Sequence, residues 1–411
     1  MIEKLLDASI RFRWGVVILT LIISAYGLSE LMKLPIDAVP DITNKQVQIN
    51  TVEPNLGPLD IERLVTFPVE TAMAGIPGLE SSRSISRNGF SQVTVIFEDH
   101  TDLYFARQQV AERLNQAKGT LPEGVEPQMG PVSTGLGEVL MYIVDFAKPG
   151  SKAAPKVAGK PGFQPDGSYM TPSGEILTDE VAKLGYLRTV QDWVIRPQIK
   201  TVSGVAGIDS IGGYEKQFVV QPDASKLSTY GISFSELAEA LERANISVGA
   251  NFVERGGEAF LVRADGRIRS VDEIGRATVA SRGGVPVAVR DVATVQIGGE
   301  LRTGSASENG KEIVVGTALM LADGNSRVVA SAVADRLEEV AKSLPPGITV
   351  KSVLDRSQLV DATIGTVEKN LLEGAFLVAI VLFWLLGNIR AAIIATLVIP
   401  ISFLIMGTGM N

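Results

Sequence analysis

The sequence contains no cysteine and a single histidine, His100. Without cysteine the chain has no disulfide framework, no thiolate metal site and no cysteine nucleophile. One histidine rules out a metal centre built from several histidines of this chain, and no Ser-His-Asp arrangement is found. The formal net charge of −8 and the isoelectric point near 5.1 argue against nucleic acid as a partner.

Long apolar segments interrupt an otherwise polar chain. Trp14–Met32, Leu371–Gly387 and Ala391–Met410 are almost free of charged residues. A bilayer core about 30 Å thick is crossed by roughly 20 apolar residues, so these segments predict three transmembrane helices in a lipid bilayer. The first segment is too long for the apolar core of a typical signal peptide and lacks a small-residue cleavage site, so we interpret it as a retained anchor.

Basic residues give the orientation of these segments. Lys4, Arg11 and Arg13 precede the first span, and Arg390 lies in the short turn between the second and third. The positive-inside rule places both sites in the cytoplasm. The long polar region between the first and second spans, here called the outer region, is therefore expected on the other side of the membrane.

The outer region contains two halves with the same pattern of helices and strands. Each half has a pair of helices that are stopped by proline or glycine and are followed by strands. We therefore predict that each half has the ferredoxin-like, split βαβ arrangement, in which two strand–helix units share one sheet. The predicted helices are Leu59–Ala74, Asp102–Lys118, Leu187–Lys200 and Ser326–Lys342, and a clear strand is Gln92–Phe97.

The second half holds an insertion that runs from Tyr214 to about residue 305. Its predicted strands are Gln217–Val220, Val285–Val289 and Ala293–Ile297, and its helix is Phe234–Ala244 with Ser233 as N-cap. Pairs of glycines lack the spacing of a phosphate loop and are predicted to be turns. These pairs are Gly212-Gly213, Gly256-Gly257, Gly283-Gly284 and Gly298-Gly299. Phe146–Thr178 has few large apolar residues and is predicted to be a mobile surface loop.

Several motifs, in order along the whole chain, are typical of one family. They are Leu34–Thr43, Ser86–Phe97, Gly130–Glu138, Gln191-Asp192-Trp193 and Asn370–Gly374. Together with the duplicated outer region, they resemble the N-terminal half of resistance-nodulation-division efflux transporters. The closest resemblance is to the heavy-metal efflux branch, the inner-membrane proteins of cobalt-zinc-cadmium pumps.

The resemblance implies an α+β membrane protein with transmembrane helices and duplicated ferredoxin-like periplasmic porter subdomains, the second of which carries an inserted α+β docking subdomain. The implied domains are an N-terminal segment with the first transmembrane helix (1–33), a first porter subdomain (39–130), a split second porter subdomain (131–213 and 305–355), the docking subdomain (214–304), a linker with the second transmembrane helix (356–387) and a truncated third helix (391–411).

The resemblance also implies partners and an activity. Members of the family work as homotrimers in the bacterial inner membrane, with a periplasmic adaptor protein and an outer-membrane channel. They exchange protons for substrate, so the chain is expected to be a secondary transporter and not an enzyme, with zinc, cobalt or cadmium ions as cargo and no bound cofactor. The proton-carrying residues of the family lie on the fourth span, beyond Asn411, so this chain alone is not expected to pump.

Two acidic clusters are candidates for metal binding. Asp37 and Asp41 lie at the outer end of the first span, where they would attract divalent cations in transit, or would end the helix and solvate the crossing into water. Asp99 and His100 lie among further carboxylates, a composition that suits zinc. The alternative, which we favour, is a turn between a strand and a helix, capped by Thr101 or Asp102.

Two other functions remain open. A pump of the same fold that exports drugs or amphiphiles would favour an aromatic pocket, whereas aromatic residues make up 6% of this sequence. A membrane-anchored periplasmic assembly protein that transports nothing would be expected to contain a long coiled coil, and no sustained heptad pattern is found. The nine methionines form no Met-x-x-Met cluster, which favours zinc, cobalt or cadmium over copper(I) or silver(I).

Overall fold

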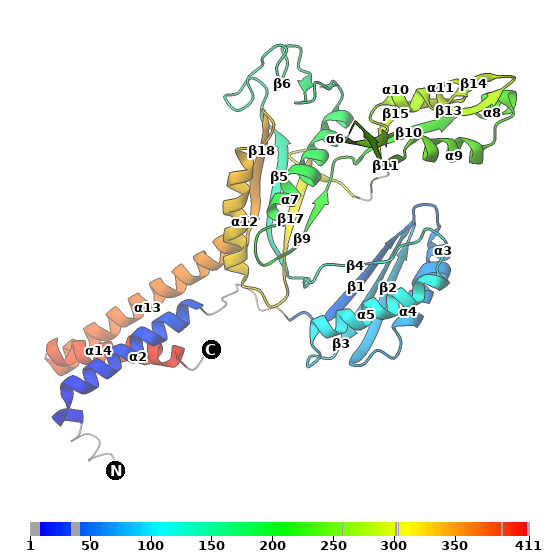
Figure 1. The fold of residues 1–411 in the computed structure, drawn as a ribbon. Helices are drawn as coiled ribbons and strands as arrows, with labels where there is room; N and C mark the ends of the chain where they lie inside the picture. Colours follow the sequence, from blue (N-terminus) through cyan, green and yellow to red (C-terminus); the bar gives the residue numbers. More distant parts are fainter. Residues whose placement is uncertain are drawn as a thin grey trace.

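The structure is a computed structural model that describes residues 9–33, 42–256, 258–300, 302, 304–387 and 389–408. Three apolar helices lie together at one end of the molecule, and the α/β subdomains extend away from them (Figure 1). These helices are α2 (Arg13–Lys33), α13 (Arg356–Leu386) and α14 (Ile389–Gly407). Within the described residues, one segment, Arg13–Glu30 in α2, is long and apolar enough to cross a membrane.

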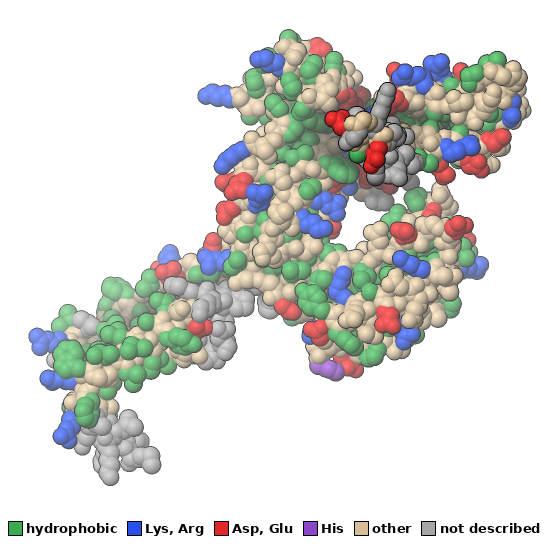
Figure 2. All heavy atoms as spheres, in the orientation of Figure 1, with side chains coloured by type: hydrophobic (Ala, Val, Ile, Leu, Met, Phe, Trp, Pro, Cys, Tyr) green, Lys and Arg blue, Asp and Glu red, His purple; other side chains and the backbone are tan. Residues whose placement is uncertain are grey.

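Apolar side chains cover the surface of this helical end. Figure 2 shows hydrophobic side chains over α2, α13 and α14, whereas charged side chains are spread over the α/β subdomains. Trp14 is 72% exposed and Trp384 is 87% exposed, and contact of such large apolar side chains with water would be unfavourable. The second and third spans stay predictions, and residues 409–411 of the third lie outside the described residues.

The first α/β subdomain is a four-stranded antiparallel sheet with helices on one face (Figure 1). The strand order β2-β3-β1-β4 is that of the split βαβ arrangement, as predicted. Its elements are β1 (Gln46–Val52), α3 (Pro58–Ile61), η1 (Glu62–Thr66), α4 (Phe67–Met73), β2 (Leu79–Arg87), β3 (Phe90–Phe97), α5 (Leu103–Ala117), η2 (Lys118–Thr120) and β4 (Gln128–Met129). Val47 and Val95 alternate with Gln48 and Thr94, so one face packs on the helices and the other is polar.

The second α/β subdomain repeats this topology. The sheet places β18, β5, β17 and β9 side by side, which again is the split βαβ order. Its elements are β5 (Glu138–Phe146), α6 (Glu180–Val190), η3 (Gln191–Ile195), α7 (Arg196–Ile199), β9 (Val205–Ile211), β16 (Ala306–Glu308), β17 (Lys311–Met320), α12 (Ser326–Ala341) and β18 (Ile348–Asp355). The first helix begins seven residues before the predicted Leu187, because the Asp179 carboxylate caps it by accepting the Ala182 N–H at 2.8 Å.

A π-helical turn interrupts the first helix of each subdomain. The turns are η1 and η3, and each is followed two residues later by a proline, Pro68 or Pro197. A proline has no N–H to donate to the carbonyl four residues earlier, and the helix widens where that bond is lost. The same local deviation at the same place in both halves supports the predicted duplication.

Residues 146–178 contain regular secondary structure that the prediction of a mobile surface loop did not include. They form a small sheet of three strands, β6 (Gly162–Phe163), β7 (Tyr169–Met170) and β8 (Ile176–Leu177). Phe146, Phe163 and Tyr169 pack with ring centroids 4.7–5.6 Å apart, and the Tyr169 hydroxyl donates to the Pro346 carbonyl at 3.0 Å. The segment has few large residues, but these few meet in one cluster and anchor it.

The insertion forms its own subdomain at the end of the molecule far from the apolar helices (Figure 1). Its elements are β10 (Lys216–Pro222), α8 (Ala224–Tyr230), α9 (Phe234–Ala244), β11 (Ser247–Arg255), β12 (Glu258–Asp265), α10 (Val271–Arg276), β13 (Thr278–Arg282), β14 (Val285–Ala288), α11 (Val289–Val292) and β15 (Ala293–Gly299). The predicted capping box of Ser233 and Glu236 is confirmed. Its hydrophobic core includes Leu227, Leu237 and Val292.

Two details of this insertion differ from the prediction. Val289 begins α11 and does not end a strand. Gly298 and Gly299 lie inside β15, where they pair with β10, and do not form a turn. A Cβ on Gly298 would lie 2.7 Å from Val219, and one on Gly299 would lie 2.8 Å from the Tyr214 ring. Close packing of neighbouring side chains, and not backbone conformation, explains these glycines.

Candidate functional site

Of the predicted metal-binding residues, the structure describes Asp99 and His100. Asp37 and Asp41 lie outside the described residues. Asp99 and His100 lie in the turn between β3 and α5, where the His100 side chain is 82% exposed and its Nε2 is 3.2 Å from Glu98 Oε2. Asp102 is the N-cap of α5, as predicted, and accepts the Phe105 N–H at 2.7 Å. Among the described residues no group of three or more His, Asp or Glu side chains is arranged to hold a metal.

The Gln191-Asp192-Trp193 motif divides its side chains between the core and the surface. Gln191 is fully buried, whereas Trp193 is 80% exposed. Asp192 lies between them and accepts hydrogen bonds from Arg188 Nε at 2.5 Å and from Ser210 Oγ at 2.6 Å. The motif thus carries a polar network from the π-helical turn η3 to the strand β9.

This network continues to the junction between the second subdomain and the insertion. Arg188 also donates to the carbonyl of Gly212 at 3.1 Å, and so fixes the backbone where the chain leaves β9. Gly212 and Gly213 have positive φ angles of 82° and 66°, which favour glycine. A Cβ on Gly212 would lie 2.2 Å from the Ile313 carbonyl oxygen, so the turn is packed tightly against β17.

A cavity of about 320 Å³ lies at this junction and is lined mostly by polar groups. The chain passes between the second subdomain and the insertion twice, and both crossings border this cavity. Glu215 lies on the first crossing, and Glu300 and Arg302 lie on the second. Burial raises the pKa of Glu300, and the negative charge of Glu215 beside it acts in the same direction. Arg302 lies over the Tyr214 ring at 4.2 Å from its centroid and pairs with Glu312.

Ion pairs and a ring contact fix the crossings of this junction. Arg188 pairs with Asp192 and donates to the Gly212 carbonyl, and Arg302 pairs with Glu312 on β17. These contacts tie both crossings to the second subdomain, so the arrangement is suited to hold the insertion in a set position relative to the second sheet.

A second contact fixes the insertion from another side. A groove of about 470 Å³ lies between α6, the small sheet of β6–β8 and the β10–β15 ladder. Lys216 Nζ on β10 pairs with Glu175 beside β8 at 2.9 Å, across this groove. Sequence reasoning missed both contacts, since their residues are far apart along the chain. The one local signal was the Gly212-Gly213 pair at the start of the insertion.

The two split βαβ subdomains, the insertion in the second and the apolar helices at both ends define a class of membrane transport protein. A family model described as the AcrB/AcrD/AcrF family matches residues 5–411, and the chain belongs to this family. The predicted resemblance to heavy-metal efflux transporters of the resistance-nodulation-division type is confirmed.

The chain is similar to several metal resistance proteins over its full length. It is 62% identical to the nickel-cobalt-cadmium resistance protein NccA of Alcaligenes xylosoxydans xylosoxydans, covering 38% of that protein. It is 60% identical to the nickel and cobalt resistance protein CnrA of Cupriavidus metallidurans (38% covered) and 47% identical to the cobalt-zinc-cadmium resistance protein CzcA of the same organism (36% covered). The chain thus spans little more than a third of the length of these relatives.

A solved structure shows the same fold. The crystal structure of a heavy metal efflux pump superposes with a TM-score of 0.82 at 30% identity. The match covers 98% of this chain and 38% of that one. The likeness therefore extends across the apolar helices, both sheets and the insertion together.

Proposed function

We propose that this chain belongs to the inner-membrane subunit of a proton-driven, tripartite efflux pump that exports divalent heavy-metal cations. One observation carries the proposal. The whole arrangement of two split βαβ sheets, an insertion in the second and apolar helices at both ends matches a heavy metal efflux pump over 98% of the chain. The named substrates of its relatives add nickel to zinc, cobalt and cadmium as candidate cargo.

This proposal assigns a role to each segment of the chain. The two α/β subdomains are porter subdomains, over 39–130 and over 131–213 with 305–355. The insertion over 214–304 is a docking subdomain, which the contacts of Arg188 and Arg302 hold on the second porter subdomain. Helices α2, α13 and α14 are the first three transmembrane helices, and they anchor the chain in the inner membrane with the α/β subdomains in the periplasm.

The proposed assembly is a homotrimer that meets a periplasmic adaptor protein and an outer-membrane channel. The position of the insertion supports this proposal, because it lies at the end of the molecule opposite the apolar helices (Figure 1). Proton exchange would drive transport. Asp37 and Asp41 are proposed to attract the cation on its way from the membrane surface into the porter region.

Metal tolerance tests the proposal. Cells that lose the gene should become more sensitive to nickel, cobalt, zinc or cadmium, and cells that regain it should recover. Unchanged tolerance to all four metals would refute the assignment, and increased sensitivity to amphiphilic drugs instead would favour a drug pump.

Paired substitutions test the proposed transit residues. Asp37→Asn with Asp41→Asn should reduce metal tolerance at unchanged protein level in the membrane. Asp99→Asn with His100→Gly is the matched control, since these residues lie on an exposed turn. Loss of tolerance in the control pair alone would reverse the assignment and place the ligand role at Asp99 and His100.

A further inference from the structure

Strand β2 lies at an edge of the first sheet and is open along its length. The strand order β2-β3-β1-β4 gives β2 one neighbour, β3. Every residue of β2 is exposed except Leu79 and Ser86, which are partly buried. Within the described part of the chain, no strand pairs with the other side of β2. Such an edge offers a row of backbone N–H and C=O groups to another chain.

The register shows which backbone groups of β2 are free. The Phe97 N–H donates to the Lys45 carbonyl, so the backbone of the odd-numbered residues of β3 faces β1 and that of the even-numbered residues faces β2. Each even-numbered residue of β3 pairs with an odd-numbered residue of β2. The alternate residues of β2 therefore have N–H and C=O groups that point away from the sheet. These residues are Ser82, Ser84 and Ser86.

The other edges of the two main sheets have features that hinder pairing and that β2 lacks. Strand β4 contains two residues, and β18 contains a bulge. On β9, a Cβ at Gly207 would lie 3.5 Å from Pro131, so another segment covers that edge. Strand β2 is nine residues long, contains no proline or lysine, and is irregular only at its start. Short strands, bulges, proline and lysine are common protections of an edge, so β2 is the least protected of the four.

Two arginines give this edge a preference for negative charge. Arg83 and Arg87 lie on either side of Ile85, on the polar face of the sheet, and Ile85 is 47% exposed. Strands β1, β3 and β4 contain no charged residue. Among the described residues, neither arginine takes part in an ion pair or a side-chain hydrogen bond. Their positive charge therefore faces the solvent without a partner.

The carboxylates of neighbouring elements lie elsewhere. Glu80 is the one carboxylate of β2 and lies in the irregular start of the strand. Glu53, beside the turn that follows β2, accepts a hydrogen bond from Asn55 at 3.2 Å. Asp60 and Glu62 belong to α3 and η1, which cover the opposite face of the sheet. None of these groups is in an ion pair with the two arginines.

These features select one kind of occupant. In a strand added beside β2, alternate side chains would lie next to Arg83, Ile85 and Arg87 on the polar face. A second copy that paired through its own β2 would place arginine beside arginine, which is unfavourable. We propose that β2 accepts an extended segment of a partner protein, in which carboxylates flank an apolar side chain at alternate positions. This interaction does not depend on metal export.

Peptide binding to the full chain in detergent tests the proposal. The probe is a fluorescein-labelled peptide of the pattern Thr-Glu-Thr-Val-Thr-Glu-Thr, followed by fluorescence anisotropy. N-methylation of one alternate set of its amides should abolish binding, and N-methylation of the other set should leave affinity within about twofold, because only one set faces β2. Ser84→Pro removes a free N–H of the edge but no bond of the β2–β3 ladder, and should weaken binding about tenfold.

Charge reversal tests the two arginines. Arg83→Glu with Arg87→Glu should weaken binding about tenfold or more, because two attractive contacts become repulsive. A peptide with lysine in place of glutamate should bind this variant better than the unaltered chain, which a misfolded variant would not do. Arg113→Glu with Lys118→Glu is the matched control, because it makes the same change of charge on α5 and η2 and should leave affinity within about twofold.

Several results would overturn the proposal. They are an equal effect of both sets of N-methyl groups, and an equal loss in the arginine pair and its control. Dimerisation of the unaltered chain that Ser84→Pro prevents would assign the edge to a second copy instead. If the gene encodes residues beyond Asn411, loss of binding in the full-length product would assign it to a later part of the same chain. Metal tolerance is not measured in these assays, so the proposed function stands or fails separately.

Discussion

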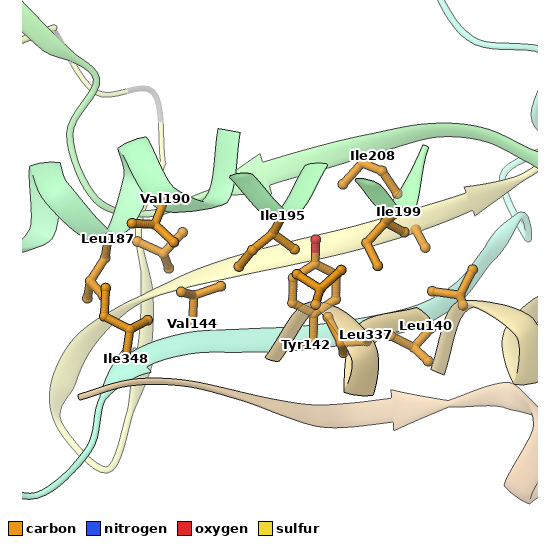
Figure 3. Close-up of a cluster of buried hydrophobic side chains, with 14 of the residues drawn as sticks. Leu140, Tyr142, Val144, Leu187, Val190, Ile195, Ile199, Ile208, Leu337 and Ile348 are labelled. Atoms are coloured by element: carbon orange, nitrogen blue, oxygen red, sulfur yellow. The ribbon is translucent and has the colours of Figure 1, made fainter. Parts of the chain in front are cut away.

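Gly316 faces the ring of Tyr142 across the two central strands of the second sheet, β17 and β5. A Cβ on Gly316 would lie 2.3 Å from the Tyr142 Cζ and 2.5 Å from its hydroxyl oxygen. Tyr142 is fully buried among Ile195, Ile199 and Leu337, so the ring has no free space into which to move (Figure 3). We therefore predict that Gly316→Ala destabilises this subdomain by about 2 kcal/mol, in the range for overpacked cores.

Hydrogen exchange measured by mass spectrometry checks this value. Peptides from β5 and β17 should exchange about 30-fold faster in Gly316→Ala, because about 1.4 kcal/mol corresponds to tenfold in an equilibrium constant. Peptides from β1 and β3 of the first subdomain serve as the internal control and should not change. Unaltered exchange in β5 and β17 would refute the packing argument.

Substitutions at Tyr142 separate the ring from its hydroxyl. Among the described residues the Tyr142 hydroxyl and Gln191 Oε1 are buried without a hydrogen bond of normal geometry, although the Gln191 side chain lies near the hydroxyl; burial raises the pKa of Tyr142. Tyr142→Phe removes an unsatisfied group and should be neutral or stabilise the subdomain by up to about 1 kcal/mol. In Tyr142→Leu, Gly316→Ala should cost much less than in the unaltered chain, because the added methyl group enters the space that the ring has left. Additive costs would show that the two residues do not interact.

Two further predictions concern charged groups. Arg327 Nε on α12 pairs with Asp361 Oδ1 on α13 at 2.7 Å, and both side chains are about half exposed. Asp361→Ala should lower the free energy of unfolding by less than about 1 kcal/mol but should speed hydrogen exchange in the first turns of α13. The charge-swapped pair Arg327→Asp with Asp361→Arg should restore protection from exchange. The pKa of Glu300 is raised in the folded chain, so folding favours its protonated form, and the stability of the chain should rise as pH falls toward the pKa that Glu300 has in the unfolded chain. Glu300→Gln should therefore stabilise the chain at neutral pH and lose this gain in stability at acidic pH. An equal gain at every pH in thermal unfolding would contradict the prediction.

Local signals predicted most of the fold, because they act within a few residues of the chain. Asp102 and Ser233 cap helices where they were expected to do so. The alternating apolar residues of Phe90–Phe97 gave a strand with one buried face. The order of strands and helices was enough to predict both split βαβ sheets, since few topologies join such units.

Errors arose where distant residues decide the structure. Phe163 and Tyr169 look sparse in a segment rich in small residues, but they pack against Phe146 and anchor the segment on the second subdomain. Gly298 and Gly299 look like a turn, but the nearness of Val219 and Tyr214 requires glycine inside a strand. Neither contact leaves a trace in the neighbouring sequence.

The sequence by itself determined the apolar ends, the duplicated α/β halves and the family to which the chain belongs, because hydrophobic periodicity, caps and motifs are written in adjacent residues. Only the tertiary structure decided how the insertion is held. The junction joins Arg188, Glu215 and Glu300. Ion pairing and cavity shape depend on distances in space, and strand pairing brings these groups together from separate segments of the chain.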